Sequence, residues 1–200
     1  MALCVSGVDP VVIVGAGLSA ADAVIAARFH SLPVLHVFRN RSVPADRQLP
    51  ENMYPEYHKV HQMMGDGGAS YPLYRSLPEH HVVDLTGMHS DGKVLIEGPD
   101  GSRTAHRASL VAILIGSRPD LSPVRPVCSG PDGLGLGVNP NAPVDCRSNP
   151  IDVDPWSYEV RRAPQRGLYA LGPIAGDTFV RFVQGGSLGI AASLSDKTNG

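Results

Sequence analysis

The sequence predicts an α/β fold with a parallel sheet, because three consecutive segments follow the pattern of a strand, a helix and a strand. Val11–Val14 is a continuous apolar run, Leu18–Phe29 places small apolar residues at helical spacing, and Pro33–Phe38 is a second apolar run. Apolar runs without alternation are typical of strands buried on both faces of a parallel sheet. Two such strands joined by one helix form a βαβ unit with a right-handed crossover.

The turn between the first strand and the helix has the glycine spacing of a dinucleotide-binding fingerprint, Gly15-x-Gly17-x-x-Ala20. Gly15 permits the tight turn, Gly17 lets the backbone approach a pyrophosphate, and Ala20 allows the helix to pack closely on the sheet. The free amides near Leu18 and Ser19 would hold the phosphates at the positive end of the helix dipole. The strand-turn-helix context predicts a Rossmann-like NAD(P)-binding domain, and a glycine turn without a ligand is the alternative.

The end of the second predicted strand favours NADPH over NAD. NAD sites place a carboxylate there to bind the ribose 2′-hydroxyl, whereas this sequence has Arg39 and Arg41, and its first carboxylate is Asp46. Two guanidinium groups suit a dianionic 2′-phosphate. FAD would also be expected to prefer a carboxylate at this place. The alternative is that both arginines are simply solvated.

The remaining segments extend this first domain. A helix is expected over 55–64, with proline at its start and Gly65 at its end. Segments 82–85, 93–97 and 103–107 are separated by Asp-Gly pairs and predict a three-stranded antiparallel β-meander. A fully buried strand is expected over 109–115, ending at Gly116.

The predicted organisation has three parts: 8–118 as the NADPH-binding domain, 119–155 as a connection, and 156–200 as a C-terminal segment. The connection is rich in proline and glycine and without clear periodicity, which is typical of an extended surface segment. In the C-terminal segment we expect strands over 156–160 and 168–171 and a helix over 187–194.

Composition excludes several classes of function. The formal net charge is −2 and there is no basic run, so no nucleic-acid partner is expected. The longest apolar stretch, Leu110–Ile115, is too short for a membrane span, and no signal peptide is visible. Cys4, Cys128 and Cys146 lack paired spacing, so we expect a reduced, cytoplasmic protein without a disulfide framework.

No residue pattern supplies an obvious catalytic group, and the catalytic residues remain unknown at this level. The Tyr-x-x-x-Lys pair of short-chain dehydrogenases is missing. His58, His61 and His80 lack a completing carboxylate, so no metal is expected. A redox reaction would therefore have to be carried by a cofactor.

Two C-terminal motifs point to a flavin. The strand ending in Gly176-Asp177 is of the kind that brings an aspartate to the ribityl chain of FAD in two-dinucleotide flavoproteins. Gln184-Gly185-Gly186 would then begin a helix whose free amides could face the flavin pyrimidine. The strand and turn at Gly116 resemble those that close the NADPH domain in the same enzymes.

Together these stretches resemble the C-terminal part of the oxidative stress-induced growth inhibitor family, relatives of the flavin-containing monooxygenases. The resemblance covers nearly the whole chain and is weakest in 66–69 and 128–144. It is specific because two of its segments, 53–64 and 149–155, are not generic Rossmann features. The matching segments are Val12–Val24, Met53–Met64, Asn149–Pro155 and Gly167–Gly186.

The resemblance implies an NADPH-dependent flavoprotein monooxygenase, in which NADPH reduces FAD and the reduced flavin reacts with O₂. It also implies a link to growth restraint, cell death and differentiation under oxidative stress. The C-terminal segment would complete an FAD domain. Such flavoproteins carry an earlier glycine-rich fingerprint for FAD, which the fourteen residues before Gly15 do not contain.

Two hypotheses follow. The chain is part of a flavin monooxygenase that is inactive without a missing flavin domain, either as a fragment or as a natural short product. Alternatively, it is a non-catalytic NADPH-binding regulator that acts through a protein partner.

Overall fold

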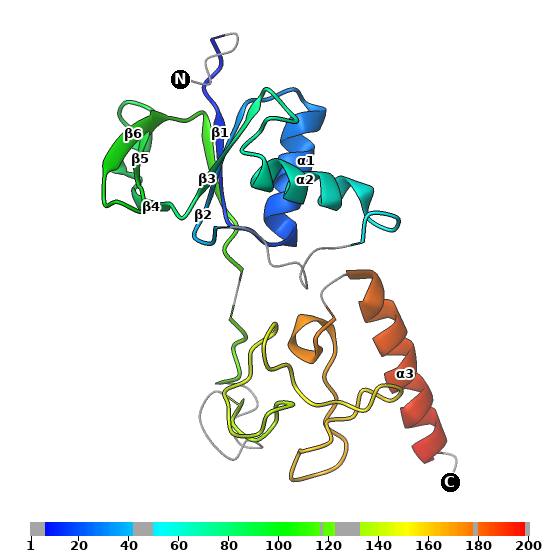
Figure 1. Cartoon of the computed structure of the whole chain (residues 1–200). Coiled ribbons are helices and arrows are strands. Elements are labelled where there is room, and N and C mark those ends of the chain that lie inside the picture. Colours follow the sequence, from blue (N-terminus) through cyan, green and yellow to red (C-terminus); the bar gives the residue numbers. More distant parts are fainter. Residues whose placement is uncertain (1–6, 42–49, 117, 123–132, 178–179, 199–200) are drawn as a thin grey trace. The chain divides into compact units, whose positions relative to one another are not determined.

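The computed structural model describes residues 7–41, 50–116, 118–122, 133–177 and 180–198. The chain divides into two compact units, Met1–Gly116 and Ser117–Gly200, which are described separately (Figure 1). Asp46, Cys4 and Cys128, which entered the sequence-based expectations, lie outside the described residues. Within the described ranges, no helix is long and apolar enough to span a bilayer.

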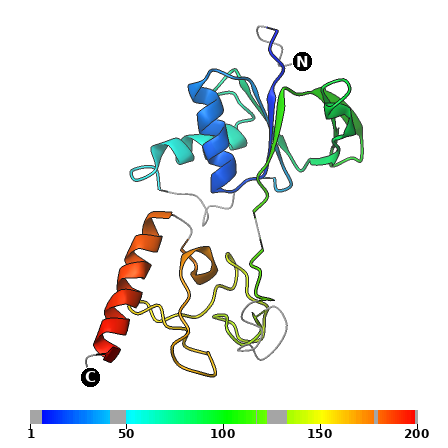
Figure 2. The ribbon, with the colours of Figure 1, turned by 180° about the vertical axis from the view of Figure 1, so that it is seen from behind.

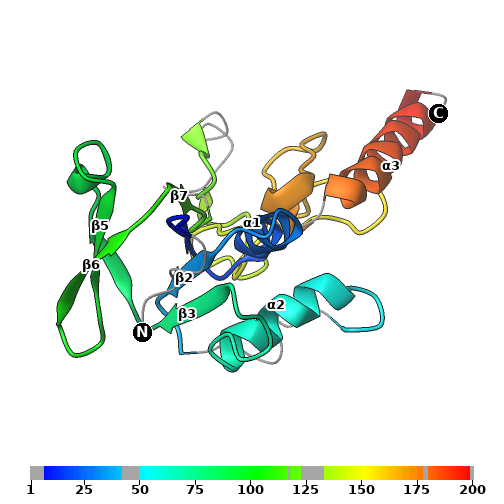
Figure 3. The ribbon, with the colours of Figure 1, turned by 90° about the horizontal axis from the view of Figure 1, so that it is seen from above.

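The first unit is built on a four-stranded parallel sheet with the order β3-β2-β1-β7. Two helices pack on one face of this sheet, and a three-stranded antiparallel meander with the order β4-β5-β6 lies on the other (Figure 3). The parallel strands are β1 (Val11–Val14), β2 (Val34–Phe38), β3 (Tyr74–Pro78) and β7 (Leu110–Ile113). The covering elements are α1 (Leu18–Phe29), α2 (Pro55–Gly65), β4 (His81–Asp84), η2 (Thr86–Met88), β5 (Lys93–Glu97) and β6 (Arg103–Arg107).

β2 is buried over its whole length, as its apolar run predicts. Val34 and Phe38 belong to the hydrophobic cluster beneath the helices, whereas Leu35 and Val37 belong to the cluster beneath the meander. This division follows from the alternation of side chains along a strand. The small residues of α1 that face the sheet, Ala20 and Val24 among them, are fully buried.

Sequence reasoning missed one strand of the sheet, and its expectation for the burial of another was wrong. The strand β3 was not expected, because only Tyr74 and Leu77 of its five residues are buried and the segment shows no apolar run. The strand after the meander was expected to be fully buried, but Leu110 and Ile113 of β7 are 57% and 51% exposed. Both strands are edges of the sheet, where one side of the strand has no neighbour to cover it.

The second unit consists mostly of loops around a small apolar core (Figure 2). The helices that lie within its described residues are η5 (Gly172–Ala175) and α3 (Val180–Thr198). The prediction of strands over 156–160 and 168–171 was wrong. These segments form only isolated β-bridges, between Val153 and Val160 and between Glu159 and Tyr169. The expected helix over 187–194 extends further in both directions.

The proline- and glycine-rich segment contributes to the core of the second unit and is not simply a surface connection. Its buried apolar side chains pack with Val160, and they are Leu121, Leu136, Val144 and Ile151. One amide and three carbonyls of this loop are bonded to the buried side chain of Asn149. Its amide nitrogen donates to three loop carbonyls at 3.0 Å, those of Asn139, Ala142 and Pro143, and its oxygen accepts from the Asn139 amide at 2.7 Å.

We expect Asn149→Ala to destabilise the protein by about 3 kcal/mol, because it removes four part-buried hydrogen bonds that hold this loop, each worth about 0.5–1.5 kcal/mol. Asn149 is 5% exposed, so water cannot readily replace these bonds. Urea unfolding measures the effect, with the exposed Asn141→Ala as the control. Equal stability of the two variants would contradict this role of Asn149.

Candidate functional site

The turn that follows β1 is fixed by its two neighbouring strands. The amide of Gly15 donates to the Val37 carbonyl of β2 at 2.9 Å, and the amide of Leu114 donates to the Val14 carbonyl at 2.7 Å. Gly15 has a φ of +130°, and a Cβ atom there would overlap the backbone carbonyl of Leu114. Only glycine therefore fits at the first position of the fingerprint.

The N-terminus of α1 offers free amides. Its N-cap is Gly17, in an extended conformation without a capping side chain, and no acidic residue lies in the first turn. The first intrahelical bond runs from the Ala21 amide to the Gly17 carbonyl at 3.1 Å, so the amides of Leu18, Ser19 and Ala20 precede the helical ladder. Such a terminus attracts an anion through its dipole and its unpaired donors.

Arg39 and Arg41 lie immediately after β2 and are exposed. Neither forms an ion pair with a carboxylate in the part of the chain that the structure describes. The parallel register aligns Val14 with Val37, so the ends of β1 and β2 meet at one edge of the sheet. The two guanidinium groups are therefore available to an anion bound near the Gly15 turn.

The same edge receives the end of β7. Val14 is aligned with Ile113, and Gly116 follows three residues later with a φ of +85°. The structure thus brings the three groups of predicted site residues in the first unit to neighbouring strand ends: the Gly15–Ala20 turn, the arginines and Gly116. We call the edge of the sheet at which β1, β2 and β7 end the carboxyl edge. Ligands of open parallel sheets bind at such an edge, where the strand order reverses.

A buried histidine beneath the turn was missed by sequence reasoning. His36, in the middle of β2, is 1% exposed. Its Nε2 lies 2.6 Å from the Gly15 carbonyl, and its Nδ1 lies 2.7 Å from the Tyr74 hydroxyl of β3. The signal was available in the sequence, since His36 is the one polar residue inside an otherwise apolar strand.

The protonation state of this group follows from its surroundings. Burial lowers the pKa of His36 to about 4, against the opposing effect of the Gly15 carbonyl, so the imidazole is neutral at pH 7. A carbonyl only accepts, so the single ring proton lies on Nε2, and Nδ1 accepts from the Tyr74 hydroxyl. Burial raises the pKa of Tyr74 well above its usual range, so the hydroxyl keeps the proton that it donates.

We expect acid to destabilise the first unit through His36. Its pKa is about 4 in the folded protein and about 6.5 when unfolded, so the unfolded state binds the proton first. Neutral His36 makes its full contribution to the free energy of unfolding above pH 6.5. This contribution is lost as the pH falls from 6.5 to 4, and the total loss is about 3 kcal/mol. Urea unfolding at several pH values measures this slope. His36→Gln should reduce it, leaving the contributions of His61 and His106, whose pKa values are also lowered by burial.

In the second unit, Gly176 and Asp177 form the predicted turn. Gly176 caps η5 with a φ of +92°, and the Asp177 amide donates to the Gly172 carbonyl at 3.1 Å. The Oδ2 atom of Asp177 is buried without a hydrogen-bond partner among the described residues. Burial and the negative charge of the Asp177 carboxylate raise the pKa of Tyr158. An unpartnered buried carboxylate oxygen fits a hydroxyl donor such as those of the ribityl chain of FAD.

Gly185 and Gly186 are not at the start of a helix, which corrects the expectation for them. α3 begins at Val180, so both residues lie in its second turn and their amides enter the helical ladder. A Cβ at Gly186 would lie 2.9 Å from the ring of Tyr158, and one at Gly189 would overlap the Trp156 carbonyl. Close packing explains the glycine at 186, whereas a Cβ at Gly185 would meet no atom within 4 Å.

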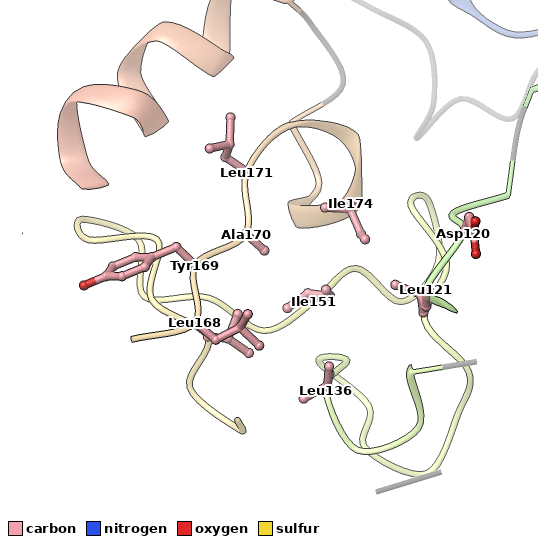
Figure 4. A pocket seen from close by; sticks show the side chains of 10 residues that line it. Asp120, Leu121, Leu136, Ile151, Leu168, Tyr169, Ala170, Leu171 and Ile174 are labelled. Atoms are coloured by element: carbon pink, nitrogen blue, oxygen red, sulfur yellow. The ribbon is translucent and has the colours of Figure 1, made fainter. Parts of the chain in front are cut away.

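A cavity of about 340 Å³ lies within the second unit (Figure 4). Apart from Asp120 and Tyr169, its lining is aliphatic, and it includes Leu136, Ile151 and Ile174. This lining offers shape and apolar contact but no acid–base pair. Within the described ranges, no group of three or more histidine, cysteine or acidic side chains could hold a metal ion.

The sheet order, the fingerprint turn and the meander define the first unit as a Rossmann-like domain. The fold is similar to bacillithiol disulfide reductase Bdr from Staphylococcus aureus, with a TM-score of 0.56, 17% identity, and coverage of 94% of this chain and 51% of that one. It is also similar to LpdA from Mycobacterium tuberculosis, with a TM-score of 0.55, 23% identity, and coverage of 96% and 35%. These likenesses establish the fold, and the expected α/β class with a Rossmann-like domain is confirmed.

The chain is a homologue of the oxidative stress-induced growth inhibitors. It is 48% identical to human oxidative stress-induced growth inhibitor 1 over 197 residues, which is 94% of this chain and 39% of that protein. It is 40% identical to human oxidative stress-induced growth inhibitor 2 over 198 residues, which is 95% of this chain and 37% of that protein. The chain therefore spans about two-fifths of the length of these relatives. The resemblance drawn from the motifs is confirmed, although no protein-family model matches.

Proposed function

We propose that the first unit binds NADPH at the carboxyl edge. The observation that carries this proposal is the pair of exposed arginines, without carboxylate partners among the described residues, beside a turn that only glycine can form. The amides of Leu18, Ser19 and Ala20 hold the pyrophosphate, and Gly17 lets it approach the backbone. Arg39 and Arg41 bind the 2′-phosphate, for which guanidinium groups are well suited.

We further propose that the NADPH serves a flavin-dependent monooxygenase of the oxidative stress-induced growth inhibitor type, linked to growth and differentiation. When bound, FAD would supply the redox chemistry that the side chains of this chain lack. Asp177 holds a ribityl hydroxyl through its unpartnered Oδ2. Bacillithiol disulfide reductase Bdr, whose fold is similar, is an oxidoreductase by its name, and the name of the 48% identical homologue refers to oxidative stress; both support this proposal.

A second candidate is a non-catalytic regulator that binds NADPH and acts through a protein partner. This candidate is favoured by the chemistry of the carboxyl edge, whose predicted site residues are glycines, small residues and guanidinium groups. None of these exchanges a proton at neutral pH, and the nearby His36 is buried behind the turn.

Titration of the purified chain with NADPH and NADH, followed by nicotinamide fluorescence, tests the binding proposal. Tight binding of NADPH and weak binding of NADH are expected. Binding of neither nucleotide would contradict it.

The visible absorption spectrum separates the two candidates. Bound flavin that NADPH bleaches supports the monooxygenase. A colourless protein that still binds NADPH supports the regulator or a fragment that lacks its flavin domain.

A further inference from the structure

The carbonyl of Gly15 is bonded to a side chain rather than to a neighbouring strand. The Gly15 amide takes part in the sheet through Val37, whereas the Gly15 carbonyl accepts from Nε2 of His36 at 2.6 Å. His36 shares its face of β2 with Val34 and Phe38, which belong to the cluster beneath the helices. The imidazole therefore holds this carbonyl from the helix-covered side of the sheet.

The orientation of one carbonyl also sets the orientation of the next amide. In a planar trans peptide the C=O and the following N–H point in opposite directions. Holding the Gly15 carbonyl against His36 therefore directs the Ala16 N–H away from the imidazole. The Ala16 amide has no acceptor within the described ranges, so it is a donor in the middle of the fingerprint turn that awaits a partner.

Tyr74 fixes which nitrogen of His36 faces the turn. Its hydroxyl donates to Nδ1 at 2.7 Å, which leaves the ring proton on Nε2. The other tautomer would place the Nε2 lone pair against the Gly15 carbonyl and leave the Tyr74 proton without an acceptor. The ring is further held by edge contacts with Phe38 and Tyr74, at centroid distances of 5.0 and 5.7 Å.

We propose that His36 and Tyr74 are positioning residues for nucleotide binding, which fix the Gly15–Ala16 peptide with its N–H available to the diphosphate. This inference rests on the proposed NADPH site and assigns a determinant of its affinity. Neither side chain touches the nucleotide, and both act through the turn. The relay runs from β3 through β2 to the end of β1, so three strands of the sheet set the orientation of one peptide.

Two substitutions of His36 separate this role from mere packing. Glutamine places a side-chain donor near the position of Nε2, whereas asparagine reaches only to the position of Nδ1. We expect His36→Asn to weaken NADPH binding at least tenfold and His36→Gln to remain within about threefold of the wild type. Fluorescence titration of the full chain with NADPH measures both, and urea unfolding checks that each variant is folded.

The outcomes are distinct. Failure of the wild type to bind NADPH overturns the proposed function and this inference with it. Wild-type binding together with unchanged affinity in folded His36→Asn overturns the role of His36 alone. If the asparagine variant does not fold, the Tyr74→Phe variant tests whether the two side chains position the turn. We expect it to weaken NADPH binding at least threefold and to give a mixture of His36 tautomers by ¹⁵N NMR, and an unchanged tautomer and affinity overturn the inference.

Discussion

Gly15→Ala is expected to destabilise the first unit by about 4 kcal/mol and to abolish nucleotide binding. The added Cβ would overlap the Leu114 carbonyl and lie 2.8 Å from its carbonyl carbon, and both atoms belong to the backbone. Backbone strain of this kind costs about 1–3 kcal/mol, and overpacking costs a similar amount. The φ of +130° is also one that alanine rarely adopts. Urea unfolding and titration with NADPH measure the two effects.

Gly65→Ala is the matched control. Gly65 is the last residue of α2, and a Cβ there would meet no atom within 4 Å. We expect this change to be neutral or to stabilise the protein by up to about 1 kcal/mol, because alanine favours the helix. A Gly15→Ala variant as stable as Gly65→Ala would show that the turn does not require glycine.

Arg39→Glu is expected to weaken NADPH binding by roughly 1.5–3 kcal/mol and to leave NADH binding nearly unchanged. The change removes a charge-assisted hydrogen bond and places a carboxylate near the 2′-phosphate. NADH has a 2′-hydroxyl, which a carboxylate can bind. Arg41→Glu should act in the same direction, since both side chains follow β2 and are exposed. Isothermal titration with both nucleotides measures the discrimination.

Arg103→Glu controls for the change in net charge. Arg103 lies on the meander and pairs with Glu97 at 2.7 Å, an exposed pair that contributes little to stability. The Arg103→Glu substitution should alter the affinity for NADPH by much less than Arg39→Glu does. Equal losses for NADPH and NADH in Arg39→Glu, or a loss for neither, would contradict the assignment of the arginines to the 2′-phosphate.

The candidate site was predicted in part because its information is local. The Gly15–Ala20 spacing, the arginines after β2 and the glycine after β7 are each adjacent to an apolar run, so their positions at strand ends follow from the chain itself. His36 was missed because its role depends on Gly15 and Tyr74, which lie 21 and 38 residues away. The reason for the glycine at 186 was also missed, because the ring that contacts it belongs to the distant Tyr158.

The sequence by itself determined the βαβ unit, the fingerprint turn and the meander, since hydrophobic period, glycine spacing and Asp-Gly turns act over a few residues. It also determined the relationship to the oxidative stress-induced growth inhibitors. Only the tertiary structure decided that β3 and β7 are edge strands, that the proline-rich segment enters a core through Asn149, and that an imidazole holds the turn. Each of these depends on pairing between segments distant in the chain, which packing specifies and local pattern does not.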